Sequence, residues 1–239
     1  MKRLIRENIV FISLSLMLIA ALGLALLCIP KGELHLILCD HHTPARDLFF
    51  KYYTQIAEYL PYIICAMILL WGRTGDGLLA TACIAGSDLT TQVLKHAVNA
   101  PRPITWFASN MPDVQLPLVE GVRMNHWFSF PSGHTTAFFS LAFIASILLT
   151  GWLAAGSNEQ ANSSSRPSKQ SYSIVVQVLL FTAAALGGYS RIYLSQHFAT
   201  DVCAGIGIGL VIPCIMYLLF APAKEKKWYN YRLLSKKMR

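Results

Sequence analysis

The sequence predicts an all-α fold: a polytopic membrane helical bundle with six transmembrane helices and a folded extracytoplasmic cap loop. Two observations support this prediction. Of the 239 residues, 54% are hydrophobic and only 13% are charged, which is about half the charged fraction of ordinary soluble domains. The apolar residues also gather in six long runs, each near the ~20 residues that a helix needs to cross a bilayer.

The six runs are expected to form the spans of one domain, 1–239, in which no internal repeat is detected. They cover residues 9–30, 55–71, 77–98, 134–154, 173–190 and 201–220. The first run follows a basic start, as a secretory signal would. It is longer than a typical signal sequence and no convincing small-residue cleavage site follows it, so it is interpreted as a span.

The segments between the runs differ in composition. Residues 32–53 mix apolar and aromatic residues with charges, which indicates an interfacial segment. Residues 99–133 contain several prolines and aromatic residues, which favours a folded cap at the level of the lipid headgroups. Residues 154–172 are rich in Ser, Asn and Gln and are predicted to form a mobile linker. The basic tail, 222–239, is expected to face anionic lipid headgroups.

The distribution of positive charge predicts the orientation in the membrane. The net charge is +8, and thirteen of the twenty Lys and Arg residues fall on the side of the two termini. Because Lys and Arg concentrate on the cytoplasmic side, both termini are predicted to be cytoplasmic, with the cap opposite. The short loops resemble those of bacterial proteins, which suggests the inner membrane and a periplasmic site. Nucleic acid is not expected as a partner.

Polar residues gather on the side opposite the termini. Three segments meet there: the end of the 77–98 run, the start of the 134–154 run and the connection between the last two runs. Cations and histidines at a membrane boundary are costly unless they are used, so a functional site is expected. The candidates are Lys95, Arg102, Ser132, His134, Arg191, His197 and Asp201.

These residue types indicate a phosphate ligand. Two arginines and a lysine can surround phosphate oxygens, and an arginine can bind two of them at once. The stretch PSGH at 131–134 predicts a helix start, with a serine cap and a glycine that allows close approach. Backbone N–H groups at such a helix start favour an anion.

His197 and Asp201 suggest a nucleophile and its orienting carboxylate. If the last span begins near Gln196, residues four apart share one helix face. The carboxylate then fixes the imidazole tautomer and leaves the other ring nitrogen free to attack. His134 is left as general acid and then general base. This chemistry requires no metal and no cofactor.

Together the three segments resemble the three signatures of the type 2 phosphatidic acid phosphatase superfamily. The stretch KHAVNAPRP matches K-x6-R-P, PSGH matches itself, and SRIYLSQHFATD matches S-R-x5-H-x3-D, in the right order. Each motif alone is weak, but the ordered set is specific. The resemblance implies a helical bundle and a phosphohistidine intermediate on His197, with Asp201 orienting it and His134 as the acid. It also implies that Lys95, Arg102, Ser132, Gly133 and Arg191 hold the phosphate.

Several polar residues also allow other interpretations. An isolated cation at the end of a span usually snorkels to the interface, but the complete motif set disfavours this for Lys95 and Arg191. The Cys-Asp-His-His run at 39–42 suggests a metal site, although no second ligand cluster accompanies it. His126 could line the pocket or lie on the loop surface. Asp88, Gln92 and Lys95 stand at i, i+4 and i+7 along one helix face, so a supporting contact to the site is plausible.

The leading hypothesis is a lipid phosphatase that hydrolyses a phosphomonoester or pyrophosphate at the periplasmic face. The proposed substrates are lipid A or undecaprenyl pyrophosphate, because the cap is long enough to contact a bulky headgroup. Phosphatidylglycerol phosphate and phosphatidate are the other candidate substrates. A lipid-to-lipid phosphotransferase is the mechanistic alternative, and a non-catalytic lipid-binding or transport protein is the alternative from another class. The oligomeric state is not predicted.

Overall fold

A computed structural model describes residues 2–155 and 169–234, and these form helices and connecting loops without a β-strand. Ten α-helices and a 3-10 helix can be assigned in this part of the chain. They are α1 (Lys2–Glu7), α2 (Ile9–Cys28), α3 (Lys31–Cys39), α4 (Pro44–Tyr53), α5 (Ile56–Trp71), α6 (Thr74–Val98), α7 (Pro103–Asn110), α8 (Gly133–Ala155), α9 (Lys169–Tyr193), α10 (Ala199–Phe220) and η2 (Ala221–Glu225).

Five segments are long and apolar enough to cross a membrane. They are Ile9–Cys28, Pro44–Trp71, Gly133–Trp152, Gln170–Tyr193 and Ala199–Glu225. They correspond to five of the six predicted runs. The remaining run, 77–98, lies in α6, which has 25 residues but is not among the five. Asp88 and Lys95 lower its apolarity, so the sixth span stays a prediction.

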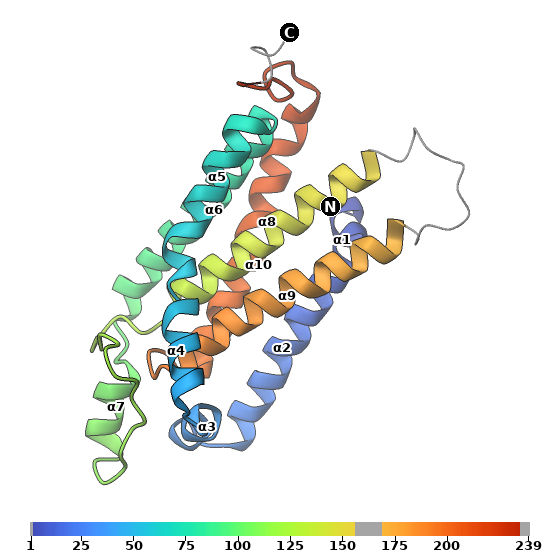
Figure 1. The fold of residues 1–239 in the computed structure, drawn as a ribbon. Coiled ribbons are helices and arrows are strands. Elements are labelled where there is room, and N and C mark those ends of the chain that lie inside the picture. Colours follow the sequence, from blue (N-terminus) through green and yellow to red (C-terminus); the bar gives the residue numbers. More distant parts are fainter. Residues whose placement is uncertain (1, 156–168, 235–239) are drawn as a thin grey trace.

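Helix α8 lies at the centre of the bundle (Figure 1), packed against α5, α6, α9 and α10. In its most apolar stretch 72% of the residues are buried, whereas the share in the other four segments is 33% or less. The other helices therefore surround α8 and present most of their apolar side chains outward, as expected where lipid is the solvent. The helix that carries the PSGH motif is thus the best-anchored helix of the bundle.

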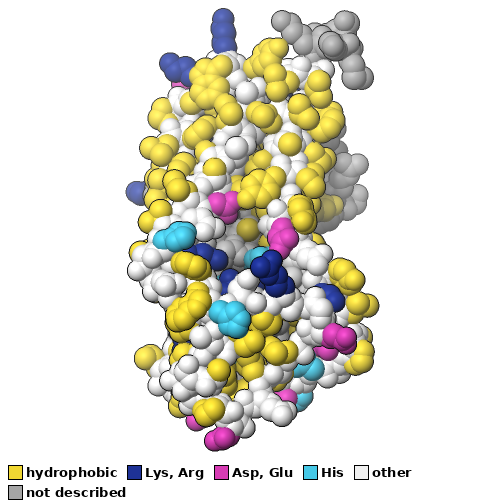
Figure 2. Space-filling view, turned by 90° about the vertical axis from the view of Figure 1, so that its left-hand side faces the viewer, with side chains coloured by type: hydrophobic (Ala, Val, Ile, Leu, Met, Phe, Trp, Pro, Cys, Tyr) yellow, Lys and Arg dark blue, Asp and Glu magenta, His cyan; other side chains and the backbone are white. Residues whose placement is uncertain are grey.

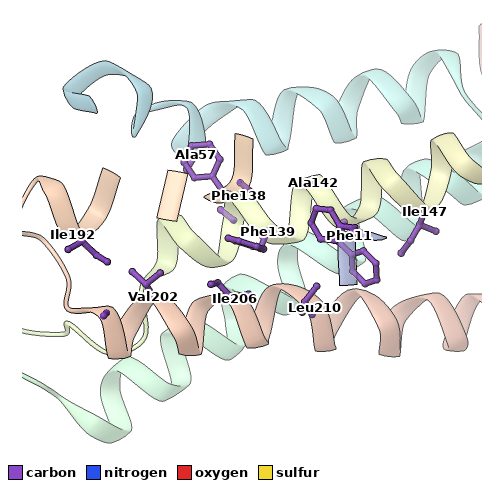
Figure 3. Close-up of a cluster of buried hydrophobic side chains, with 14 of the residues drawn as sticks. Phe11, Ala57, Phe138, Phe139, Ala142, Ile147, Ile192, Val202, Ile206 and Leu210 are labelled. Carbon is purple, nitrogen blue, oxygen red and sulfur yellow. The ribbon is translucent and has the colours of Figure 1, made fainter. Parts of the chain in front are cut away.

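The largest core cluster joins α2, α8, α9 and α10 (Figure 3). Phe11 of α2 stacks on Phe143 of α8 with ring centroids 5.4 Å apart, and it contacts Phe139 edge-on at 6.3 Å. Ile206 and Leu210 of α10 belong to the same cluster. In a bilayer such contacts act mainly through close packing, because lipid tails are as apolar as the side chains themselves.

Two glycines let α10 approach α8 closely. A Cβ atom at Gly205 would lie 2.8 Å from the Ser132 carbonyl oxygen, and one at Gly209 would lie 2.6 Å from the Phe139 Cβ. Both distances are shorter than a carbon atom tolerates, so only glycine allows this spacing. The first turns of α8 and α10, which carry two of the three motifs, are therefore held in direct contact.

The predicted interfacial segment, 32–53, folds largely as α3 and α4. Its second half, from Pro44, is instead part of the candidate membrane segment Pro44–Trp71. The predicted cap segment, 99–133, contains α7 followed by irregular chain, and it lies at the same end of the molecule as α3 (Figure 1). The Lys51 ammonium joins the two segments by donating to the Glu120 carbonyl at 3.0 Å. The predicted linker, 154–172, lies mostly outside the described residues.

The described part of the C-terminal tail packs against the start of α6. Tyr229 is buried, and its hydroxyl donates to Asp76 Oδ1 at 2.9 Å. The backbone N–H of Gly75 donates to the Tyr229 carbonyl at 2.9 Å. This aromatic anchor holds the tail at the end of the molecule opposite the motifs (Figure 1).

Candidate active site

The three motif segments meet at the first turns of α8 and α10. The Ser132 N–H donates to the Asp201 carbonyl at 3.0 Å. A Cβ atom at Gly133 would lie 3.8 Å from the Lys95 ammonium nitrogen, so the end of α6 reaches the same place. All residues predicted for the site lie in this region: Lys95, Arg102, Ser132, Gly133, His134, Arg191, His197 and Asp201.

His197 does not lie on a helix, contrary to the expectation that the last span begins near Gln196. Helix α10 begins at Ala199, with Phe198 as its N-cap residue in extended conformation. The chain turns sharply just before, where Ser195 has a left-handed φ of 50°. Asp201 is the third residue of α10, and its carboxylate accepts a hydrogen bond from the Phe198 N–H at 3.0 Å. Helix capping, and not a shared helix face, therefore brings the pair together.

The Asp201 carboxylate faces one nitrogen of His197. Its Oδ2 lies 3.5 Å from His197 Nδ1 and accepts a 2.6 Å hydrogen bond from the Ser129 hydroxyl. The Ser129 oxygen is also 3.5 Å from Nδ1. Acceptors on this side favour a proton on Nδ1. The other nitrogen, Nε2, has no hydrogen-bond partner in the described part of the chain and keeps its lone pair free.

His197 is buried, and burial lowers its pKa below the ordinary value for histidine. Arg102 and Arg191 act in the same direction, whereas the Asp201 carboxylate opposes them. Burial is the largest of these effects, because a charged imidazolium loses its hydration there. The ring is therefore neutral near pH 7, which is the form a nucleophile needs.

Arg191 is the most enclosed cation of the site. Its carbonyl accepts hydrogen bonds from the N–H groups of Gln196 and His197 at 3.0 and 3.1 Å, so it also shapes the loop that carries the nucleophile. Its Nη1 donates to the Thr54 hydroxyl at 2.7 Å. Its buried Nε has no partner among the described residues. An unsatisfied buried guanidinium nitrogen indicates a place for an anionic ligand.

Arg102 and Lys95 complete the cationic group. Arg102 donates through Nε to the Trp127 carbonyl at 3.1 Å and through Nη1 to Gln196 Oε1 at 2.8 Å. Lys95 makes no ion pair within the described ranges. Three cations thus converge near His197, and the nearest carboxylate, Asp201, faces the imidazole. This arrangement suits a phosphate with two negative charges.

Ser132 caps α8, as predicted. Its side-chain oxygen accepts hydrogen bonds from the Thr135 hydroxyl at 2.8 Å and from the Thr135 N–H at 3.4 Å. The next two residues, Gly133 and His134, form the first turn of the helix. His134 Nε2 lies 3.2 Å from Glu58 Oε1 of α5, a contact that the sequence did not predict.

A cavity of about 340 Å³ opens beside these groups. It is lined by Lys51, Thr54, Gln55, Glu58, Gly121, Val122, Arg123, Asn125, His134, Arg191, Leu194 and Gln196. Figure 2 shows Lys, Arg and His side chains gathered at mid-height on one face, below a surface that is largely hydrophobic. The polar site therefore lies at the edge of the apolar belt, where a lipid headgroup would be.

Four residues that support the site were missed in the sequence. Gln196 is an unspecified position within the third motif, and Ser129 lies two residues before PSGH, so their positions were a weak signal. Thr54 lies just before α5 and Glu58 lies in its first turn. Both are far from any motif along the sequence, and no sequence pattern indicated them. They make the junction of α4 and α5 a fourth segment of the site.

The polar residues considered for a supporting role form no side-chain hydrogen bond with the predicted site residues within the described ranges. Asp88 accepts a 2.6 Å hydrogen bond from the Tyr62 hydroxyl, so its partner is on α5 and not in the site. Gln92 is exposed. His126 is exposed in the loop and contacts the Thr105 hydroxyl at 3.1 Å.

The Cys-Asp-His-His run at 39–42 is not gathered around one point. Its second histidine, His42, lies 2.8 Å from Asp47. Cys39 is buried, and His41 is an exposed residue with positive φ. In the part of the chain that the structure describes, no group of three or more His, Cys, Asp or Glu residues is arranged to hold a metal ion.

The helical bundle and a cationic pocket with two histidines define a helical membrane protein whose site is suited to an anionic ligand. The family model for the PAP2 superfamily matches residues 76–225. The chain therefore belongs to the PAP2 superfamily, as the three motifs indicated.

The chain is similar to two known relatives and to one solved structure. Phosphatidylglycerophosphatase B of Bacillus subtilis is 29% identical over 150 residues, which are 63% of this chain and 61% of that protein. Lipid A 4′-phosphatase of Porphyromonas gingivalis is 29% identical over 200 residues, 82% of this chain and 75% of that protein. The crystal structure of a PAP2-type phosphatidylglycerolphosphate phosphatase from Bacillus subtilis has the same fold, with a TM-score of 0.63, 22% identity, and coverage of 92% and 99%.

Proposed function

We propose that the protein is a lipid phosphatase that acts through a phosphohistidine intermediate on His197. The observation that carries this proposal is the buried His197 ring, held at Nδ1 by Asp201 and free at Nε2 beside three cations. Binding of a phosphate alone would not need this orientation of a neutral imidazole. A non-catalytic lipid-binding role is therefore disfavoured.

The reaction proceeds in two steps. In the first, the Nε2 lone pair of His197 forms a bond to phosphorus while the bond from phosphorus to the leaving oxygen breaks, and that oxygen takes a proton from His134. In the second, His134 takes a proton from water as the water oxygen attacks phosphorus. The N–P bond breaks, inorganic phosphate leaves and His197 is restored. Lys95, Arg102 and Arg191 stabilise the charge that develops on the phosphate oxygens.

An apolar cavity next to the polar one supports a lipid substrate. It has a volume of about 320 Å³ and lies between α5, α8 and α9. Ala57 of α5 and Phe138 of α8 line it. These residues directly follow the turns that hold Thr54 and His134 in the polar cavity. A molecule with a phosphate in one cavity and an acyl chain in the other would fit both.

Two further cations favour a substrate with a second phosphate. Lys51 and Arg123 line the polar cavity together with His134 and Arg191, but they belong to none of the three motifs. Lipid A and undecaprenyl pyrophosphate both carry two phosphates, and these remain the preferred substrates. The similarity to a lipid A 4′-phosphatase supports this choice. Phosphatidylglycerol phosphate, which also has two, is the next candidate.

The site is proposed to face the periplasm of a bacterial inner membrane. The motifs lie at the end of the molecule away from the described C-terminal residues (Figure 1). The excess of Lys and Arg near the termini favours a cytoplasmic location for that other end. The products would then be released outside the cytoplasm.

Phosphate release by the detergent-purified protein tests the activity. The panel should contain lipid A, undecaprenyl pyrophosphate, phosphatidylglycerol phosphate and phosphatidate, with and without EDTA. We expect release from the first two and no effect of EDTA, because three cations already neutralise the phosphate. Loss of activity in EDTA that a divalent ion restores would contradict the metal-independent mechanism. Transfer of labelled phosphate to an added lipid would favour the phosphotransferase.

A further inference from the structure

The contact between Glu58 and His134 lies outside the three motifs. The Glu58 carboxylate is on the first turn of α5, and its Oε1 is 3.2 Å from His134 Nε2. Both residues line the polar cavity, together with Arg191. The Nδ1 atom of His134 has no hydrogen-bond partner among the residues described. The ring is thus held at one nitrogen and free at the other, as the His197 ring is.

Groups that carry or can carry a positive charge surround His134. The groups that face it are Lys95 at the end of α6, Arg102 before α7, Arg191 at the end of α9 and His197 before α10. Like charges disfavour an imidazolium, yet a general acid must carry a proton before the leaving group departs. Within the described ranges, Glu58 is the carboxylate paired with His134.

The packing around α5 gives this contact a fixed position. Four residues before Glu58, the Thr54 hydroxyl binds Arg191 at 2.7 Å, and between them Ala57 is part of the main core cluster. The α4–α5 junction is therefore tied both to the phosphate site and to the core. The side chain of Glu58 is 47% exposed and that of His134 25%, so the pair can exchange protons with water.

We propose that Glu58 is a positioning residue for the general acid, whose carboxylate holds the His134 ring and favours its protonated form. This inference rests on the proposed function. It predicts that removing the carboxylate weakens protonation of the leaving group and leaves attack by His197 intact. The effect should therefore depend on how much the leaving group needs a proton.

The test compares two probes in wild type, Glu58→Gln, Glu58→Asp and the control Glu120→Gln. The 4′-phosphate of lipid A has an alkoxide leaving group, whereas p-nitrophenyl phosphate has a leaving group that departs without a proton. Glu120 is an exposed carboxylate of the cap segment, so its substitution removes the same charge outside the site. Glu58→Gln should lower kcat for the lipid ~10²-fold, the lower range for general acid catalysis, and that for p-nitrophenyl phosphate only a few-fold.

The pH dependence adds a second measurement. Without the carboxylate the acid loses its proton at lower pH, so the defect of Glu58→Gln on the lipid should grow as pH rises. Glu58→Asp should retain more activity than Glu58→Gln, and Glu120→Gln should match the wild type. An equal loss on both probes at every pH would show a structural role and overturn the inference.

Histidine NMR of the labelled protein in detergent gives a readout independent of turnover. The His134 resonance, identified by its absence in His134→Asn, should change to the neutral form at lower pH in Glu58→Gln than in the wild type. An unchanged titration would overturn the role of Glu58 and leave the proposed function intact. A wild type that releases no phosphate from any lipid of the substrate panel would instead overturn the proposed function itself.

Discussion

At the scale of single residues, the two histidines of the site have different surroundings. His197 is buried against Asp201 and Ser129, whereas His134 is partly open to the cavity and paired with Glu58. Each ring faces a carboxylate, so the two histidines differ in exposure: His197 is enclosed, whereas His134 is open to water. We propose that His197 acts as the nucleophile and His134 as the acid.

Substitutions in the pair His197 and Asp201 test the first of these roles. His197→Ala should reduce turnover to background, because the covalent route is lost. Asp201→Asn keeps the shape but weakens the orientation of the ring, and we expect a loss of ~10³ or more by analogy with the serine triad. Acid-quenched wild type should carry acid-labile, alkali-stable label from labelled lipid phosphate. Near-normal turnover by His197→Ala would refute the assignment.

The pH dependence of phosphohistidine formation tests the burial of His197. The reacting form is the neutral ring, and burial lowers its pKa below the usual 6.5. The rate should therefore hold as the pH falls through 6.5 and decline only below it. Single-turnover quenching between about pH 4 and pH 8 measures this rate. A loss of rate toward acid pH with its inflection above the ordinary histidine pKa would be inconsistent with a desolvated ring.

At the scale of elements, the contact between α8 and α10 sets the geometry of the site. The backbone bond between Ser132 and Asp201 is possible because Gly205 lets the two helices meet. Small residues at helix contacts serve this purpose in membrane bundles. The PSGH turn and the Asp201 carboxylate, for which we propose phosphate binding and orientation of His197, are thus held in direct contact.

Two single glycine substitutions in α10 distinguish the effect of losing this contact from the effect of a change in helix propensity. Gly205→Ala places a methyl group 2.8 Å from the Ser132 carbonyl oxygen, which should cost ~1–3 kcal/mol of stability and lower activity. Gly207→Ala is the matched control, because nothing lies within 4 Å of its Cβ position. Thermal unfolding in detergent, with activity measured in parallel, compares the two. Equal behaviour of both variants would contradict a tight α8–α10 contact.

At the scale of the whole molecule, orientation in the membrane decides which lipids the site can reach. The charge asymmetry predicts cytoplasmic termini and a periplasmic cap. Asp113→Cys, at an exposed position of the cap, should react with a membrane-impermeant thiol reagent in intact spheroplasts. Lys226→Cys, in the exposed tail, should react only after permeabilisation. The reverse pattern would place the site in the cytoplasm and remove the envelope lipids as substrates.

The sequence alone determined the helical class, five of the membrane segments and the group of residues in the site. These features depend on composition and on short spacings: apolar runs for the helices, and the PSGH cap for the start of α8. Helix ends were less predictable. The last helix begins at Ala199 because Asp201 caps it, and the preceding turn at Ser195 was not visible in the pattern of apolar residues.

The tertiary structure decided which distant residues support the site. Glu58 and His134 are 76 residues apart, and Thr54 and Arg191 are 137 apart. No local pattern links such pairs, because their contacts exist only once α5 packs against α8 and α4 packs against α9. The partner of Asp88 was equally hidden, since Tyr62 lies on a neighbouring helix. Spacing along the chain identified the residues of the motifs, whereas the packing of helices selected the partners that tune them.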